Sequence, residues 1–252
     1  YIRYSEQEYE EKRITQDDLP LQDKDRDSVV WINVDGLDDV QLLKTLGEQF
    51  NLHPLTMEDI FYMDQRPKVE DFGHYLYLVC KMFIFNAKEQ DIQAEQFSLV
   101  LSDSVVLSFQ EVAGDVFDPL RERLRIGKGK VRKMNADYLA YSLLDAIVDS
   151  YFFVLESFGE QIETLEDTLV TQPTNQSLQQ VHYLRRQMIL LRRAVWPLRE
   201  VIRSLEKSET AFVDSTSTTY LRDLYDNIVQ IVDTIEIYRE ILSGMLELYL
   251  SS

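Results

Sequence analysis

The hydrophobic positions near the end of the chain follow a heptad pattern. Between residues 220 and 252, apolar side chains recur with alternating spacings of three and four, at Leu221, Leu224, Ile228, Ile231, Ile235, Tyr238, Leu242, Met245 and Tyr249. This spacing keeps one face of a long α-helix against its neighbours. At the helical rise per residue the apolar seam from Leu221 to Tyr249 is roughly 40 Å long. We predict a rod-like stalk helix.

The stretch before the stalk is also helical in pattern. Residues 135–170 contain no proline, and their only interior helix breaker is Gly159. Residues 171–175 have turn chemistry, and residues 176–207 form a return helix that Pro197 is expected to kink. These two helices predict an antiparallel hairpin roughly 50 Å long. Residues 208–219 are rich in Ser and Thr, which favours a loop before the stalk.

The first half of the chain alternates short apolar runs with amphipathic segments. Runs typical of strands, rich in β-branched and aromatic residues, lie at residues 29–34, 75–85, 96–101 and 105–109, with a further edge strand expected at residues 1–4. Helical periodicity covers residues 38–50, 55–61 and 115–125. Alternating strands and helices predict an α/β domain with a mixed sheet sandwiched by helices.

A change of composition at residues 127–130, a basic joint with two glycines, indicates a boundary. We therefore divide the chain into an N-terminal α/β domain (1–128), a long helical hairpin (129–209) and the stalk (210–252). The long helices carry more apolar surface than the hairpin and the stalk helix of one chain are expected to bury by themselves. This argument predicts a homo-oligomer with the stalks side by side.

Composition narrows the functional classes. The chain has 252 residues with a formal net charge of −18, which argues against nucleic-acid partners and is compatible with cation binding. A single cysteine excludes a disulfide framework and a cysteine-based zinc site and favours a reducing compartment. No uninterrupted apolar run of 18 residues is present. The chain starts at Tyr1 and its stalk ends without a cap, so we expect the polypeptide to continue at both ends.

Candidate chemistry is restricted to carboxylates. The three histidines lack the spacing of a zinc helix, and no phosphate loop or nucleophile elbow is present, so the sequence does not indicate an enzyme. Acidic residues at suggestive positions are Glu58, Asp59, Asp145, Asp149, Asp223 and Asp226. Oxygen ligands of this kind suit Mg²⁺ or Ca²⁺. A single surface acid is more often a solvated charge, although Asp145 lies among apolar residues, and spacing alone does not join these acids into one site.

Several motifs then point to one family. They are Trp31-Ile32-Asn33-Val34, Leu52-His53-Pro54-Leu55, Asp64-Gln65-Arg66-Pro67-Lys68-Val69-Glu70, Gly114-Asp115-Val116-Phe117-Asp118-Pro119, Ala136-Asp137-Tyr138, Trp196-Pro197-Leu198-Arg199-Glu200 and Tyr238-Arg239-Glu240-Ile241-Leu242-Ser243-Gly244. From about residue 29 to its end the chain resembles the CorA family of magnesium and cobalt channels. The family's Gly-Met-Asn signature is absent, since Gly244-Met245-Leu246 differs in residue and position.

The resemblance implies a pentameric funnel in the inner (cell) membrane. This chain would be its cytoplasmic part, and its stalk would lead into the first membrane span. Regulatory Mg²⁺, which Co²⁺ or Ca²⁺ could replace, would bind between neighbouring subunits. The implied ligands are Asp59 of one subunit and Asp223 of the next, with Glu58 and Asp145 at an adjacent position. The ion would stabilise the closed state.

Two other readings stay open. One is the cytoplasmic domain of a related zinc transporter of the ZntB type, although residues 65–70 fit CorA better. The other is a structural coiled-coil oligomerisation module without metal sensing. Separately, an acidic face on the first long helix is similar to that of the CorA family, but a solvated surface is the simpler interpretation; its residues are Glu156, Glu160, Glu163, Glu166 and Asp167.

Overall fold

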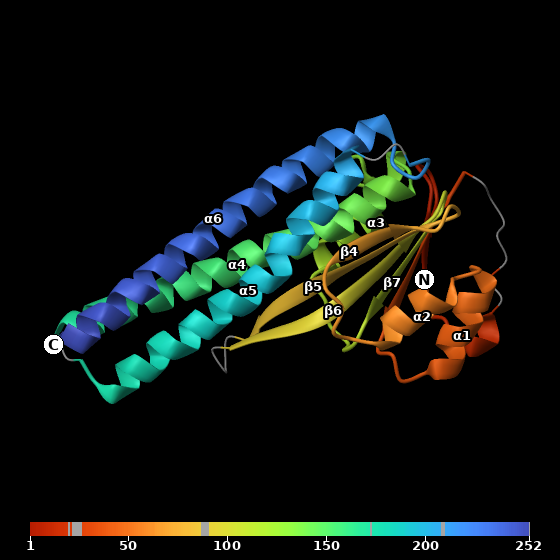
Figure 1. Cartoon of the computed structure of the whole chain (residues 1–252). Coiled ribbons are helices and arrows are strands. Elements are labelled where there is room, and N and C mark those ends of the chain that lie inside the picture. Colours follow the sequence, from red (N-terminus) through yellow and green to blue (C-terminus); the bar gives the residue numbers. More distant parts are fainter. Residues whose placement is uncertain (20, 22–26, 87–90, 172, 208–209, 252) are drawn as a thin grey trace.

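A seven-stranded mixed sheet lies between two helical layers (Figure 1). The computed structural model describes all residues except 20, 22–26, 87–90, 172, 208–209 and 252. The strands are β1 (Ile2–Tyr4), β2 (Tyr9–Glu11), β3 (Val29–Asp35), β4 (Lys68–Asp71), β5 (Leu76–Asn86), β6 (Asp91–Leu101) and β7 (Val105–Gln110). The helices are η1 (Gln16–Asp18), α1 (Val40–Gln49), α2 (Pro54–Phe61), α3 (Asp118–Ile126), η2 (Val131–Lys133), α4 (Ala136–Thr171), α5 (Asn175–Lys207) and α6 (Ser215–Ser251). The predicted α/β architecture with a following set of long helices is confirmed.

The strand order of the sheet is β2-β1-β3-β7-β6-β5-β4. Strands β3 and β7 are parallel, and the other neighbouring strands among the described residues pair antiparallel. Side chains of β5 alternate between the two faces: Leu76 and Leu78 join one apolar cluster, while Tyr77 and Val79 join the other. Burial on both faces explains why this strand reads as one continuous apolar run.

Helices α1 and α2 cover one face of the sheet (Figure 1). Leu43, Leu46 and Ile60 from these helices pack with the strand residues of that face. Local chemistry sets where the helices start: the Asp39 carboxylate accepts a hydrogen bond from the Leu42 backbone N–H, and Pro54 occupies the first turn of α2. Proline is suited to this position because its missing N–H would have no helical partner.

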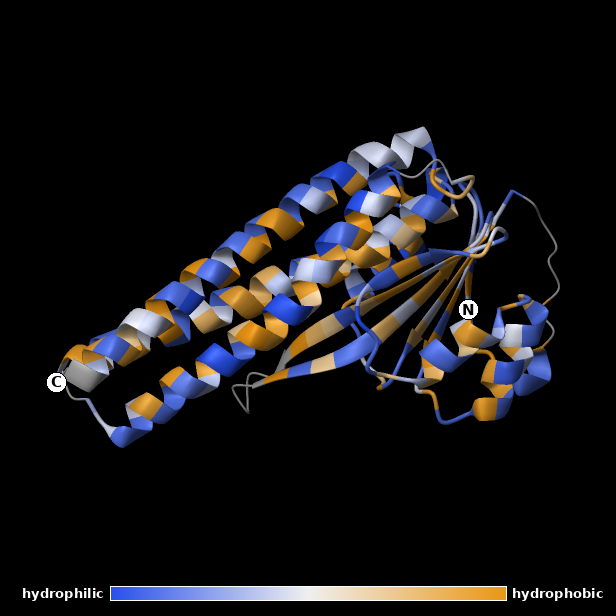
Figure 2. Ribbon diagram, in the orientation of Figure 1, coloured by the Kyte–Doolittle hydropathy of each residue, from blue (hydrophilic) through white to orange (hydrophobic). Residues whose placement is uncertain are grey.

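The other face is covered by α3 and the three long helices. Helix α6 packs along both α4 and α5, and these two helices contact α6 more extensively than they contact each other. Hydrophobic stripes on the long helices alternate with hydrophilic ones (Figure 2). The Tyr249 hydroxyl lies 3.1 Å from Oδ1 of Asn175, so the end of α6 meets the start of α5 at the hairpin tip.

The heptad seam of α6 is buried inside a single chain. Leu224, Ile228 and Ile231 are all fully buried in one apolar cluster with residues of α4 and α5. The argument that these apolar faces exceed what one chain can bury is therefore wrong. Helix α6 packs along both α4 and α5 and covers their apolar faces. A homo-oligomer must be argued from other surfaces.

Several local predictions also need correction. Strand β1 is not an edge strand, because β2 pairs outside it. Strands β2 and β4 were not predicted, since their short polar sequences lack an apolar alternation. Helix α6 starts at Ser215, inside the predicted loop at residues 208–219, and the Asp214 carboxylate accepts a hydrogen bond from the Thr216 backbone N–H there. Residues 208–209 of that predicted loop, and Gln172 of the predicted turn at residues 171–175, lie outside the described residues. The division at residues 128 and 209 stays a prediction.

Three features of α4 answer questions raised by the sequence. In the part of the chain that the structure describes, α4 is the one helix long and apolar enough to cross a membrane, but 61% of its most apolar window is buried in the fold, as in the core helix of a soluble domain. A Cβ atom at Gly159 would overlap the Tyr238 hydroxyl of α6, so any larger residue there would have to displace that side chain. The acidic residues of α4 from Glu156 to Asp167 are exposed, which confirms a solvated face.

Candidate functional site

The carboxylates singled out from the sequence lie in two separate places. Glu58 and Asp59 are on α2, in the layer that covers one face of the sheet. Asp145 on α4 and Asp223 on α6 belong to the layer on the other face. Asp145 and Asp223 lie close enough for the charge of Asp223 to raise the pKa of Asp145, whereas Asp59 lies across the sheet from Asp223. An ion shared by Asp59 and Asp223 requires two copies of the chain.

Asp59 already has a cationic partner. The Lys68 ammonium on β4 lies 2.6 Å from Oδ2 of Asp59 and 2.8 Å from Oε2 of Glu70. Burial lowers the pKa of Lys68, but its bonds to Asp59 and Glu70 raise it by more, so the net shift is upward. The sequence reading missed Lys68, although the alternation in Lys68-Val69-Glu70 indicates that Lys68 and Glu70 share one face of a strand. Glu58, one residue before Asp59, is exposed.

The backbone around Asp59 is fixed by a buried glutamine. The Gln96 side chain is 3% exposed and donates from Nε2 to the Asp59 carbonyl oxygen at 2.8 Å. The Oε1 atom of Gln96 accepts from the Gln65 backbone N–H at 2.9 Å. One side chain of the sheet thus connects the end of α2 to the loop that follows, and this holds the Asp59 carboxylate above the start of β4.

The second group of carboxylates lies between α4 and the start of α6. Asp145 is partly buried, and its pKa is raised to about 6, first because burial disfavours the charged form and next because Asp149 and Asp223 repel it. A hydrogen bond to Tyr141 and the charge of Arg123 on α3 act in the opposite direction. The sequence reading of Asp145 as an acid needing a partner fits this environment, but it did not identify Tyr141 or Arg123.

This group fits a hard cation in its chemistry. The carboxylates of Asp145, Asp149 and Asp223 and the Tyr141 hydroxyl all carry oxygen atoms that can bind a cation, and the negative charges of Asp149 and Asp223 both act on Asp145. Among the described residues, no set of three or more His, Cys, Asp or Glu side chains is close enough to form a complete metal site within one chain. Any bound Mg²⁺ would therefore rely on water or on a second copy for its remaining ligands.

Replacement of Asp145 by Asn is expected to stabilise the chain in metal-free buffer at pH 7.5. The folded-state pKa of Asp145 lies above its usual value of 3.8, so wild-type stability from this group is lost as pH rises from about 4 to about 6. We expect a gain of about 1–2 kcal/mol at pH 7.5, discounted for partial solvation. Urea denaturation in EDTA at pH 4.5 and 7.5 measures it; a gain that did not shrink at pH 4.5 would contradict the assignment.

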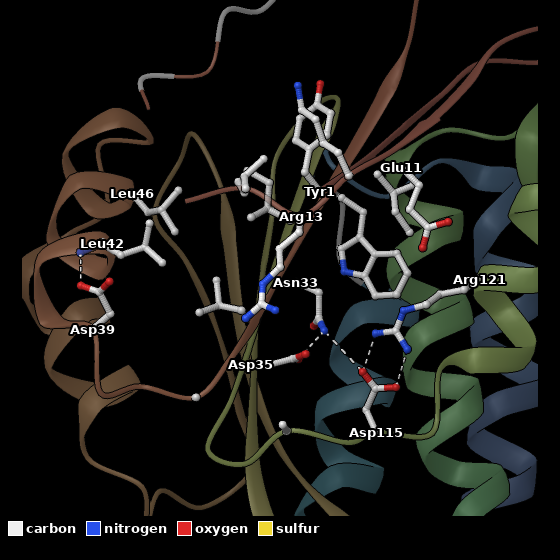
Figure 3. Close-up of a pocket in the computed structure, with 18 of the residues that line it drawn as sticks. Tyr1, Glu11, Arg13, Asn33, Asp35, Asp39, Leu42, Leu46, Asp115 and Arg121 are labelled. Atoms are coloured by element: carbon white, nitrogen blue, oxygen red, sulfur yellow. Dashed lines mark hydrogen bonds and ion pairs between the residues drawn. The ribbon is translucent and has the colours of Figure 1, made fainter. Parts of the chain in front are cut away.

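A cavity of about 1080 Å³ lies at the carboxyl ends of the parallel strands β3 and β7 (Figure 3). The Arg121 guanidinium donates to both carboxylate oxygens of Asp115, at 2.7 and 2.5 Å, and lies 5.3 Å from the Trp31 ring. The Asn33 amide donates to Asp35 at 2.7 Å and to Asp115 at 3.3 Å. Two motifs distant in sequence thus meet in one polar network, whose buried carboxylate, Asp115, is satisfied within the chain.

Comparison with known proteins agrees with the geometry. The sequence matches the family described as "CorA-like Mg2+ transporter protein" over residues 26–252. The cobalt/magnesium transport protein CorA of Thermotoga maritima is 43% identical over 251 residues, which cover 100% of this chain and 72% of that protein. The putative metal ion transporter YfjQ of Bacillus subtilis is 22% identical over 92% of this chain and 72% of its own length.

Solved structures of low sequence identity share the fold. The complete CorA magnesium transporter from Methanocaldococcus jannaschii superposes with a TM-score of 0.80 at 18% identity, covering 99% of this chain and 76% of that chain. The ZntB cytoplasmic domain from Vibrio parahaemolyticus superposes with a TM-score of 0.72 at 14% identity, covering 98% of this chain and 95% of that domain.

Proposed function

The chain belongs to the CorA family of Mg²⁺ transporters, and from this premise we propose that it is the cytoplasmic Mg²⁺-sensing and gating part of a pentameric Mg²⁺/Co²⁺ channel in the cell membrane. In this proposal Asp59 of one copy and Asp223 of the next hold a regulatory Mg²⁺. Glu58 and Asp145 line an adjacent position. The filled sites stabilise the closed state.

The observation that carries the proposal is the 43% identity to a cobalt/magnesium transport protein over the full chain. The placement of the acids supports it. Asp59 and Asp223 lie in layers on opposite faces of the sheet, so a repeated contact that joins them uses two different surfaces of each copy. Heterologous contacts are the kind from which a pentameric ring is built when the rotation between copies closes.

The environment of the acids suits weak, reversible binding. Mg²⁺ gives up its water reluctantly and is usually held by few carboxylates. In the metal-free chain, Asp145 lies close enough to Asp149 and Asp223 for their charges to raise its pKa. A cation at this position offsets that repulsion and favours the ionised form of Asp145.

The gating step is a population shift. An ion that binds the closed ring more tightly than the open one moves the equilibrium toward the closed ring, in proportion to the difference in affinity. When Mg²⁺ is scarce, no ion bridges the acids of neighbouring subunits, and the open ring gains population. Uptake of Mg²⁺ would in this way limit itself.

Two alternatives have weaker support. A zinc-transporting function rests on a fold likeness at 14% identity, whereas the family match and the full-length relative are of the CorA type. Exposed apolar seams no longer support a purely structural coiled-coil module, because the apolar seam of α6 is buried within its own chain. Such a module would also show no metal-dependent change in protease sensitivity.

Mg²⁺ is expected to raise the melting temperature of the chain by about 3–5 °C at ten times its dissociation constant. A variant with Asp59→Ala and Asp223→Ala should lose this shift, while a control with Glu166→Ala and Asp167→Ala, which changes net charge equally on an exposed face, should keep it. Differential scanning fluorimetry and sedimentation in EDTA and in Mg²⁺ measure both effects. A double variant that retains the wild-type shift would refute the site.

A further inference from the structure

The Asp59 carboxylate is paired with a lysine side chain of the same chain, Lys68. Lys68 bridges Asp59 and Glu70, with its ammonium within 2.8 Å of both carboxylates. The Asp59 side chain is 16% exposed and the Lys68 side chain 30% exposed, so neither charge is fully screened by water. The side chain proposed as an Mg²⁺ ligand is therefore already compensated before any ion arrives.

The geometry keeps Lys68 at this place. Its backbone is held in β4 by pairing with β5, opposite Val79, and its ammonium lies 5.8 Å from the Tyr77 ring. Asp59 is held on its side by the bond from Gln96 to its carbonyl oxygen. Glu70, two residues along the same strand face, offers a second carboxylate within reach of the ammonium. Lys68 can thus release Asp59 without losing every ionic partner.

We propose that Lys68 is a built-in counter-ion that competes with Mg²⁺ for Asp59 and so sets the Mg²⁺ concentration at which the inter-subunit site fills. The inference rests on the proposed function, because it assumes that Asp59 binds the regulatory ion. Without Mg²⁺, the ammonium neutralises Asp59. When Mg²⁺ binds, the flexible lysine side chain leaves Asp59 and keeps its ion pair with Glu70, and the energy of the lost Lys68–Asp59 pair is subtracted from the binding energy.

A structural role for Lys68 leads to a different expectation. An ion pair that only attaches α2 to β4 stabilises the chain equally with and without Mg²⁺. Its removal would then lower the melting temperature in both conditions and leave the half-saturating Mg²⁺ concentration unchanged. Competition instead changes that concentration, because a competitor at the binding atom raises the apparent dissociation constant.

The test is a Mg²⁺ titration of the melting temperature at constant ionic strength, for the wild type and for Lys68→Met. Competition predicts that the variant half-saturates at about fivefold lower Mg²⁺, the effect of removing a partly exposed ion pair. Lys81→Met is the matched control: this lysine bonds to the Met63 carbonyl oxygen and lies 3.9 Å from Asp64, so its loss removes the same charge without freeing Asp59. Its half-saturation should change less than twofold.

Two further variants separate the possible outcomes. Lys68→Gln repeats the test with a side chain that can still hydrogen-bond, in case the methionine variant does not fold. Asp59→Asn should abolish the Mg²⁺-dependent rise in melting temperature, which Lys68→Met should shift to lower Mg²⁺ concentration. An Asp59-dependent response with unchanged half-saturation in both Lys68 variants would overturn the role of Lys68 and leave the proposed function intact. A wild-type response that Asp59→Asn does not alter would overturn the proposed site and this inference with it.

Discussion

Replacement of Arg121 by Met is expected to lower the free energy of unfolding by about 3–5 kcal/mol, because it leaves the Asp115 carboxylate buried without a cation. Asp115 is 4% exposed and receives two bonds from Arg121. The guanidinium also lies over the fully buried Trp31 ring, so the substitution weakens the packing of α3 against β3 as well. Urea denaturation at pH 7.5 measures the change.

Two controls make this prediction specific. Arg125 on the same helix is exposed and pairs with Glu11 and Glu122 at the surface, so Arg125→Met should change stability little. Adding Asp115→Asn to Arg121→Met should restore part of the lost stability, since the uncompensated charge is then removed. If Arg121→Met proved as mild as Arg125→Met, the buried network at the end of β3 would not hold this part of the fold together.

The second large effect is expected at Ile228, a fully buried residue of the α6 seam. Ile228→Ala should cost about 2–5 kcal/mol of unfolding free energy, from lost apolar burial and the cavity left between α6 and its neighbours. Because the seam is buried within one chain, this loss should be the same at all protein concentrations. Denaturation at concentrations that differ 100-fold measures it.

Ile237 on the same helix provides the matched control. Its side chain is 55% exposed, so Ile237→Ala should change the stability of the single chain by no more than about 0.5 kcal/mol. A loss at Ile228 that grew on dilution would show that copies of the chain, rather than α4 and α5, bury the seam. That result would also reinstate the oligomer argument drawn from the sequence, which the structure contradicts.

Most of the fold could be predicted from local signals. The periodicity of residues 135–170 and 176–207 identified α4 and α5 within one or two residues, and Pro54 marked the start of α2. Strands β2 and β4 escaped because short polar strands carry no apolar pattern, and they form only through pairing with β1 and β5. Ser and Thr at residues 215–219 indicated a loop, but with Asp214 as the cap they begin α6.

The candidate site was predictable in part. Residue type and position singled out Glu58, Asp59, Asp145 and Asp223, the family resemblance joined them into sites, and they stay predictions as Mg²⁺ ligands. Asp145 could also be suspected from its apolar neighbours, and the charges that raise its pKa come from Asp149 one turn away and from Asp223 on another helix. The partner of Asp59 could not be foreseen, because Lys68 reaches it only when β4 joins the sheet beneath α2.

By itself the sequence determined the kinds of elements in this protein, their order, its acidic character and its family, because these depend on residue type and on spacing along the chain. The tertiary structure alone decided where the α6 seam is buried, which charge lies on Asp59, and which acids are neighbours. Those are contacts between residues far apart in sequence. They follow from how helices and strands pack around the sheet, and no local pattern records that packing.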